Sequence, residues 1–412
     1  MRKLWSYENT LVLLMSLANG VVALDRLAVS FLSPYIVAEF HISNTQLGLL
    51  ASALSVAVAG SGYLLASLAD STRLRKQILL VMLLLFSVCS SLSGLAGGFA
   101  LLLMARGVLG LTEGPIVPVA QSIVAIESSE HRRGLNMGIM LNLGAALIGM
   151  GLGPILATRI AEAFGWRAAF FVSCIPGLLL VLAIALFVRP PPEAPRAAPA
   201  PVIPGGLSGI GKVLTSRNII LCILISGLAS AWLIIQSVFL PLYLVRTDGL
   251  KPTDMGLVIS VTGIAAAIAG MAVPALSDRF GRRPILALAC VFAALAPLAT
   301  LFVHGSAPLI AFALFIGYAG AGAGALYVGV IPSESVPARY VATAVAISLA
   351  AGELIGGVAA PALAGRAADI FGLAAPFWIT AVCALVCGGL SLFLIETSPR
   401  KLRAVAAAAA KA

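Results

Sequence analysis

Charged residues are scarce in this sequence. Only 10% of its 412 residues are Asp, Glu, Lys or Arg, whereas about a quarter of the residues in a typical soluble protein carry a charge. Apolar residues make up 60% of the chain. This composition leaves too little polar surface for a water-soluble domain, and we therefore expect a membrane protein.

Histidine is nearly absent, and cysteine is never clustered with it. The chain has 3 histidines, none of which lies in a group with cysteines or carboxylates, so no metal site is predicted. No nucleophile is paired with a base either, so we expect neither an enzyme nor a cofactor, apart from a proton as coupling ion. The cysteines all fall in apolar stretches and are typical of small core residues: Cys89, Cys174, Cys222, Cys290, Cys383 and Cys387.

Long apolar runs dominate what the sequence does contain. A run of about 20 apolar residues is long enough for a helix to cross a bilayer. The sequence therefore predicts an all-α membrane protein with twelve transmembrane helices. The expected spans are 10–34, 46–69, 77–97, 99–126, 134–161, 167–188, 218–245, 254–276, 284–303, 306–332, 340–364 and 373–395.

The net charge of +10 is distributed unevenly between the two sides of the membrane. An even number of spans places both termini on one side, and most lysines and arginines fall on that side. Because cytoplasmic loops carry the excess of positive charge, we expect both termini in the cytoplasm and no nucleic-acid partner. The opposite loops and helix ends hold only Arg159, Arg167, Arg246, Lys251 and Arg366.

The chain contains an internal repeat. A shift of about 208 residues aligns "SNTQLGLL" at 43–50 with "KPTDMGLV" at 251–258, and "GWRAAFFV" at 165–172 meets "GLAAPFWI" at 372–379 with the shift changed by one. Two parallel six-helix halves follow from such a repeat. The predicted organisation is an N-terminal bundle, a Pro-rich cytoplasmic linker, a C-terminal bundle and a cytoplasmic tail, at 1–188, 189–217, 218–396 and 397–412.

The loop after the second half's second span reads "SDRFGRRP" from Ser277. It resembles the signature loop of the major facilitator superfamily, in which an aspartate is followed by arginine, glycine and basic residues. Gly281 permits a tight turn, and the arginines would anchor in the anionic leaflet or pair across the two halves. The first-half copy is "ADSTRLRK". The resemblance implies alternating access, with conformational gating by Asp70, Asp278, Arg279, Gly281 and Arg282.

Opposite charges lie deep in the first half. Asp25 and Arg26 interrupt the apolar "GVVALDRLAVSFL", and Arg106 and Glu113 are seven residues apart in "ARGVLGLTEGPIVP". A charge at the centre of a membrane helix costs roughly 2.5–3.5 kcal/mol on insertion scales, so each needs a partner. Arg106 and Glu113 share a helix face, about 10 Å apart along the axis. We expect Asp25 to pair with Arg106 and Arg26 with Glu113; static bridges between helices are the alternative.

The repeat does not copy these charges. The same shift sends them to Leu233, Ile234, Leu314 and Ala321, so they are not part of the common scaffold. Glu353, in "LAAGELIGGVAAP", is the deep charge of the second half, and it too lacks a counterpart. It is a second proton site, a polar contact for substrate, or a glutamate close enough to the helix end to reach water.

The first-span "LDR" and the fourth-span Arg and Glu are similar to those of the anion:cation symporter family, which includes bacterial importers of sugar acids and aromatic acids. The resemblance implies that Asp25 and Glu113 titrate with the coupling proton, that Arg26 meets the substrate carboxylate, and that Arg106 belongs to the coupling network. Spinster-type lipid transporters share this pattern. In addition, "GMGLGP" at 149–154 partly resembles a motif of drug/proton antiporters.

These patterns predict a multi-pass transporter of a bacterial inner membrane, acting as a monomer in the lipid bilayer. We expect proton-coupled uptake of a small organic anion, such as a sugar acid or an aromatic or aliphatic carboxylate. The alternative is a proton-coupled exporter of drugs or of amphiphiles such as lysolipids. A receptor is not favoured, because no soluble domain is appended. Further candidates for substrate contact are Tyr35, Asn142, Trp232 and Gln236, of which Trp232 and Gln236 share a helix face.

Overall fold

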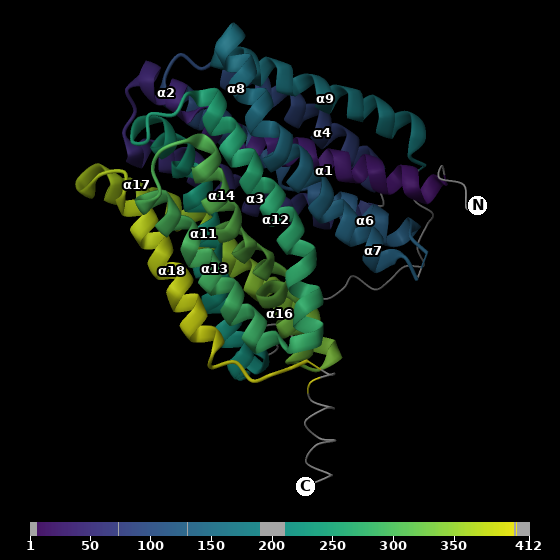
Figure 1. The fold of residues 1–412 in the computed structure, drawn as a ribbon. Helices are drawn as coiled ribbons and strands as arrows, with labels where there is room; N and C mark the ends of the chain where they lie inside the picture. The colour runs from purple at the N-terminus through teal and green to yellow at the C-terminus, as the bar shows by residue number, and fades with distance from the viewer. Residues whose placement is uncertain (1–5, 73, 130, 190–210, 399–400, 402–412) are drawn as a thin grey trace. The chain divides into compact units, whose positions relative to one another are not determined.

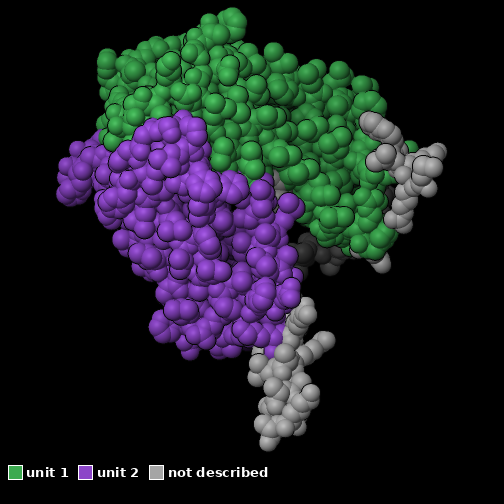
Figure 2. All heavy atoms as spheres, in the orientation of Figure 1, with its two compact units in different colours: residues 1–197, 241–264 green, residues 198–240, 265–412 purple. Residues whose placement is uncertain are grey.

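The computed structural model describes residues 6–72, 74–129, 131–189, 211–398 and 401, and these form helices joined by short connections (Figure 1). Contacts divide the chain into two compact units (Figure 2). Unit 1 consists of residues 1–197 and 241–264, and unit 2 consists of residues 198–240 and 265–412. Most of the predicted linker 189–217 and of the predicted tail 397–412 lies outside the described residues, so these boundaries stay a prediction.

Unit 1 contains the first six predicted spans, together with the end of α11 and the start of α12. Its α-helices are α1 (Tyr7–Phe31), α2 (Ser33–Phe40), α3 (Asn44–Thr72), α4 (Arg75–Gly94), α5 (Phe99–Glu113), α6 (Ile116–Glu127), α7 (Arg133–Gly138), α8 (Gly153–Phe164) and α9 (Trp166–Phe187). Two π-helical segments, η1 (Ile139–Leu143) and η2 (Ala145–Leu152), connect α7 to α8.

Unit 2 contains most of the second half. Its α-helices are α11 (Arg217–Arg246), α12 (Pro252–Phe280), α13 (Arg282–Phe302), α14 (Ala307–Tyr318), α15 (Ile331–Glu334), α16 (Val341–Ala351), α17 (Ala360–Phe371) and α18 (Ala375–Ser391). The shorter segments are η3 (Ala319–Ala323), η4 (Leu326–Val330), η5 (Ala338–Tyr340) and η6 (Gly352–Ala359). Of these, η4 and η6 are π-helical.

The predicted spans are largely confirmed. Among the described residues, 11 helices are long and apolar enough to cross a membrane, and the twelfth predicted span holds the apolar α18 of 17 residues. Many large apolar side chains are exposed, among them Leu186, Phe302 and Phe312, which are 68%, 65% and 65% exposed. Such an outer surface suits lipid and would be unfavourable in water.

The internal repeat is visible in the helices themselves. The π-helical η2 and η6 each have 8 residues, and α8 and α17, which follow them, each have 12. Both pairs then end at a glycine in the left-handed region, Gly165 with φ 84° and Gly372 with φ 86°, a conformation that glycine adopts at little cost. The two halves thus share one helical plan, down to a local departure from α-helical geometry.

Candidate functional site

The site of greatest interest lies inside unit 1, where α1 carries Asp25 and Arg26. The two residues are neighbours, but their side chains have different surroundings. Asp25 is 1% exposed, whereas the side chain of Arg26 is 30% exposed. Successive helical residues point about 100° apart, so this divergence follows from their positions on α1. The two charged side chains therefore have different hydrogen-bonding partners.

The Asp25 carboxylate is held by hydroxyl groups from two other helices. Ser90 of α4 and Ser173 of α9 both donate hydrogen bonds to its Oδ1 atom, and the Ser173 contact measures 3.1 Å. The two hydroxyl oxygens are also 2.8 Å from each other. The other carboxylate oxygen, Oδ2, has no hydrogen-bond partner among the described residues. Helix α9 packs against both α1 and α4, which brings these side chains together (Figure 1).

The predicted ion pair between Arg26 and Glu113 is confirmed. Arg26 Nη1 lies 3.3 Å from Glu113 Oε1 and donates a hydrogen bond to it. The Glu113 side chain is only 3% exposed. It stands at the end of α5, where Gly114 and Pro115 interrupt the fourth span before α6 begins. The partly exposed Arg26 guanidinium is thus held by the buried Glu113 carboxylate.

The predicted pairing of Asp25 with Arg106 does not occur as an ion pair between their side chains. Arg106 is 2% exposed, and it donates to main-chain oxygens of α1: Nη1 lies 3.2 Å from the carbonyl oxygen of Asp25, and Nη2 lies 2.6 Å from that of Arg26. A carbonyl oxygen has two lone pairs and can accept such a bond in addition to its helical one. The Asp25 carboxylate is turned toward the two serines instead. Arg106 therefore fixes the backbone that carries both neighbouring charges.

Small and polar residues of α1 hold it close to the π-helical segments. A Cβ on Gly144 would collide with the main chain at Ser16, and one on Gly149 would lie 2.6 Å from the Cβ of Ala23. Asn19 donates to the carbonyl oxygens of Met140 and Leu141, at 3.2 and 2.8 Å. Gly149 belongs to the "GMGLGP" motif, so close packing against α1 accounts for this glycine without any reference to export.

The remaining predicted binding residues are divided between the two units. Tyr35 lies on α2 and is partly buried, while the side chains of Asn142 and Asp70 lie outside the described part of the structure. In unit 2, Trp232 is 4% exposed; its indole donates to the carbonyl oxygen of Ala293 at 2.9 Å. This internal bond and its burial place the Trp232 ring in the packed interior of the unit rather than on a free surface.

Two further unit 2 residues remain candidates. Gln236, on the same helix as Trp232, is fully buried, and neither atom of its amide group has a partner among the described residues. Such a group is costly unless something binds it. Glu353 is partly buried and lies in η6, next to glycines that pack against Ser226 and Ser230 of α11. Its role stays a prediction.

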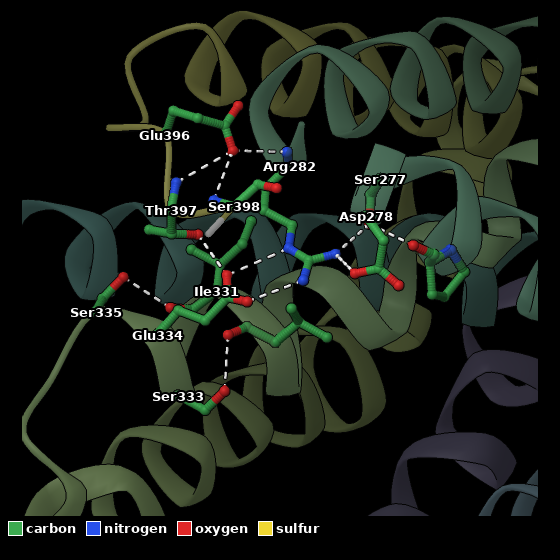
Figure 3. Close-up of polar contacts among 12 residues, drawn as sticks. Ser277, Asp278, Arg282, Ile331, Ser333, Glu334, Ser335, Glu396, Thr397 and Ser398 are labelled. Carbon is green, nitrogen blue, oxygen red and sulfur yellow. Dashed lines mark hydrogen bonds and ion pairs between the residues drawn. The ribbon is translucent and has the colours of Figure 1, made fainter. Parts of the chain in front are cut away.

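The signature loop of unit 2, which begins at Ser277, forms an ionic network with Glu334 and Glu396 (Figure 3). Gly281 makes the turn with φ 105°, as the motif predicts. Arg282 is 7% exposed, lies 2.5 Å from Asp278 Oδ1, and donates to both carboxylate oxygens of Glu334 at 2.9 and 3.2 Å. It is thus paired within unit 2 and does not anchor in lipid. Arg279 is exposed, with its guanidinium 5.3 Å from the Phe280 ring centroid.

The segment that follows α18 adds further contacts to this network. Glu396 accepts hydrogen bonds from the main-chain N–H groups of Arg282 and Arg283, at 2.8 and 3.4 Å, and so caps the start of α13. Thr397 donates to Glu334 Oε2 at 2.6 Å. Sequence analysis missed Glu334 and Glu396. The sequence pattern that could have indicated them is an acidic residue just after a predicted span, on the same side of the membrane as the arginine-rich loop.

Comparison with known proteins now identifies the family. The family model described as Major Facilitator Superfamily matches residues 15–348 and 235–411. The chain belongs to the Major Facilitator Superfamily. It is 29% identical over 340 residues to a hexuronate transporter of Bacillus subtilis (strain 168), covering 78% of this chain and 79% of the relative. It is 29% identical over 336 residues to a probable 4-methylmuconolactone transporter of Cupriavidus pinatubonensis (strain JMP 134 / LMG 1197), covering 79% and 76%.

Among solved structures, a bacterial homologue of the human lysosomal transporter Spinster, inward-facing and unoccupied, has the same fold. The TM-score is 0.73 at 19% identity, and the alignment covers 94% of this chain and 96% of that one. The predicted fold and the absence of an enzymatic role are confirmed.

Proposed function

We propose that this chain is a proton-coupled symporter that takes up a small organic anion by alternating access. The observation that carries the proposal is the pair of Arg26 and Glu113, in which 30% of the arginine side chain is exposed and 3% of the glutamate. A buried ion pair contributes little to stability compared with apolar packing. Charged residues in a membrane span are expensive, and they commonly mark substrate and proton pathways.

The chemistry of the pair suits anion binding controlled by a proton. When Glu113 is ionised, it neutralises Arg26 and competes with any external anion. Protonation of Glu113 removes that competitor, and the planar guanidinium can then bind a substrate carboxylate with two parallel hydrogen bonds. Release of anion and proton on the other side restores the pair. Asp25 would be the second proton site, and Arg106 would keep its main chain in place.

The relatives support a carboxylate as substrate. One is named for hexuronate, a sugar acid, and another is a probable 4-methylmuconolactone transporter. Uptake of one proton with a monoanion would be electroneutral. Each additional proton would draw on the membrane potential, about 2.3 kcal/mol per charge per 100 mV. We place the protein in a bacterial inner membrane with both termini in the cytoplasm, as the distribution of positive charge predicts.

The test is uptake of labelled glucuronate, and then of a panel of aliphatic and aromatic carboxylates, into proteoliposomes with an imposed pH gradient. Symport predicts accumulation when the outside is acidic. Accumulation only when the inside is acidic would indicate proton antiport, and hence export of the kind that moves drugs or lysolipids. Failure of every carboxylate under both gradients, with an amphiphile moved instead, would overturn the proposal.

Arg26→Lys provides the residue-level test. The variant keeps the charge but loses the planar fork, so we expect carboxylate affinity to fall at least tenfold. Arg159→Lys, on the exposed surface of α8, is the matched control and should bind normally. Affinity is measured by the thermal shift of purified protein with ligand, because a bound ligand raises stability by mass action. Normal affinity in the Arg26 variant would remove Arg26 as the anion ligand.

A further inference from the structure

The hydroxyl groups around Asp25 form a chain that ends on a main-chain carbonyl. Ser90 and Ser173 both contact Asp25 Oδ1, and their own oxygens lie 2.8 Å apart. Ser173 also contacts the carbonyl oxygen of Phe170, one turn earlier on α9, at 2.9 Å. The cluster thus has four contacts between oxygens but only two hydroxyl hydrogens to fill them. More than one arrangement of hydrogens fits the same heavy atoms.

One arrangement suits an ionised Asp25. Ser90 then donates to Oδ1, and Ser173 donates either to Oδ1 or to the oxygen of Ser90. All hydrogen bonds point toward the negative charge, and hydrogen bonds to an ionised acceptor are stronger than neutral ones. The Phe170 carbonyl loses nothing essential, since it retains its place in the α9 helix.

The reverse arrangement suits a neutral Asp25. A proton on Oδ1 is donated to Ser90, Ser90 donates to Ser173, and Ser173 donates to the Phe170 carbonyl oxygen. Each hydroxyl group again donates one bond and accepts one. The two arrangements differ only by the added proton and by rotation of two hydroxyl groups about their C–O bonds. No side-chain carbon and no helix has to move.

We propose that Ser90 and Ser173 are positioning residues that allow Asp25 to bind and release a proton inside unit 1 without a change in packing. The inference rests on the proposed function in one respect, because it takes Asp25 as a proton site. It adds that the reversible hydroxyl chain supplies hydrogen bonds to both charge states of Asp25, beside the charge of Arg106.

The charged surroundings of Asp25 are consistent with this role. The charge of Arg106 acts on the Asp25 carboxyl group, but its guanidinium donates hydrogen bonds to main-chain oxygens and not to the carboxylate. The thiols of Cys89 and Cys174 adjoin the two serines in sequence. Other charged groups on the elements that carry the cluster and the arginine are Glu8, Arg26, Arg75, Lys76, Glu113 and Arg167.

A neighbouring serine shows that burial alone does not require such a chain. Ser87 lies one turn before Ser90 on α4 and is also 1% exposed. Its hydroxyl donates to Leu83 of its own helix at 2.7 Å, the usual solution for a serine inside an apolar span. Ser90 instead reaches across to α1. Ser87 is therefore a matched control that differs in hydrogen-bonding partner.

The test is an infrared titration of purified protein without substrate, following the carboxylic C=O band that disappears in Asp25→Asn. Ser90→Ala removes a hydrogen bond from both forms, and because the bond to the ionised form is the stronger one, the midpoint of this band should move up by about one pH unit. Ser173→Ala should move it in the same direction. Ser87→Ala should leave it unchanged, and Ser173→Thr, which keeps a hydroxyl, should restore the parent midpoint.

The outcomes separate this inference from the proposed function. Midpoints in both alanine variants equal to that of the parent would overturn the hydroxyl chain, even if uptake is driven by protons. The same holds if Asp25 gives no titrating band between about pH 3 and 10, a range that covers ordinary and strongly shifted carboxyl groups. Conversely, a normal titration with the expected shifts but no carboxylate uptake under either gradient would leave the inference standing and remove the proposed symport.

Discussion

Replacing Glu113 by glutamine tests proton coupling most directly, and the structure sets the expected cost. Glutamine keeps the size of a protonated glutamate but cannot ionise. Breaking a fully buried ion pair costs roughly 3–5 kcal/mol, whereas exposed pairs contribute about 0–1 kcal/mol. Glu113 is 3% exposed but Arg26 is 30% exposed, so water can reach the cation left behind. We therefore expect a loss of about 1–2 kcal/mol, between these limits, and a protein that still folds.

The functional effect of Glu113→Gln should be much larger than its effect on stability. The variant resembles the proton-loaded state permanently, so substrate should still bind and exchange across the membrane. Net uptake driven by a pH gradient should collapse, because the empty carrier returns only after losing its proton. Counterflow and gradient-driven uptake are measured in the same batch of proteoliposomes, so that differences in reconstitution cancel. Glu162→Gln, at an exposed position of α8, serves as the control and should behave as the parent.

Two results would refute this reasoning. Intact gradient-driven uptake by Glu113→Gln would show that Glu113 is not an essential proton site and would leave that role to Asp25 or Glu353. A variant that is poorly folded and inactive in every assay would instead support a static bridge between helices. The melting temperature distinguishes the cases, because at roughly 2 cal/mol/K of unfolding entropy per residue a loss of about 1–2 kcal/mol lowers it by only about 1–2 °C.

Three further predictions concern residues at the ends of helices. Asp278→Asn should slow transport but leave substrate affinity within a few-fold, because Asp278 is 67% exposed and Arg282 keeps Glu334; lost binding in folded protein would contradict this. Glu334→Gln should lower the melting temperature more, since it removes the paired charge from the buried arginine; an equal or smaller loss would argue against it. Hydrogen bonds from Trp166 and Arg167 hold the pKa of Glu39 below its ordinary 4.5, so its stabilisation is present above that pH and lost as pH falls below it. Glu39→Gln should reduce the dependence of the melting temperature on pH between about pH 5 and 3. An unchanged dependence would contradict a stabilising role for the ionised Glu39.

Sequence alone predicts the parts of this protein that follow from periodic or local rules. Span positions come from the length of apolar runs, and the turn at Gly281 comes from a glycine next to charged residues at a helix end. The pair of Arg26 and Glu113 followed from helix geometry, because a spacing of seven residues places Glu113 and Arg106 on one face. These features depend on residues within one helix, or on two buried charges for which the sequence offers few other charged partners.

The contacts of Asp25 could not be predicted in this way. Ser90 and Ser173 are serines in apolar spans, distant in sequence from Asp25, and most such serines bond to their own helix, as Ser87 does. The rule that opposite charges pair was also misleading for Arg106, because it does not consider main-chain oxygens as acceptors. Only the packing of three helices decides which polar group each side chain meets.

The asymmetry between the two halves indicates why the charges are present. The shift that aligns the halves places Leu314 at the position of Arg106, and Leu314 is fully buried in α14. The same helical plan is therefore built once with an apolar residue and once with a buried arginine. Well-packed apolar residues are usually as stable as buried ions or more so, so stability cannot explain the arginine. Under the proposed function, Arg106 would keep in place the charges of α1 that bind the anion and the proton, a role that the apolar Leu314 cannot fill at the matching position of the second half.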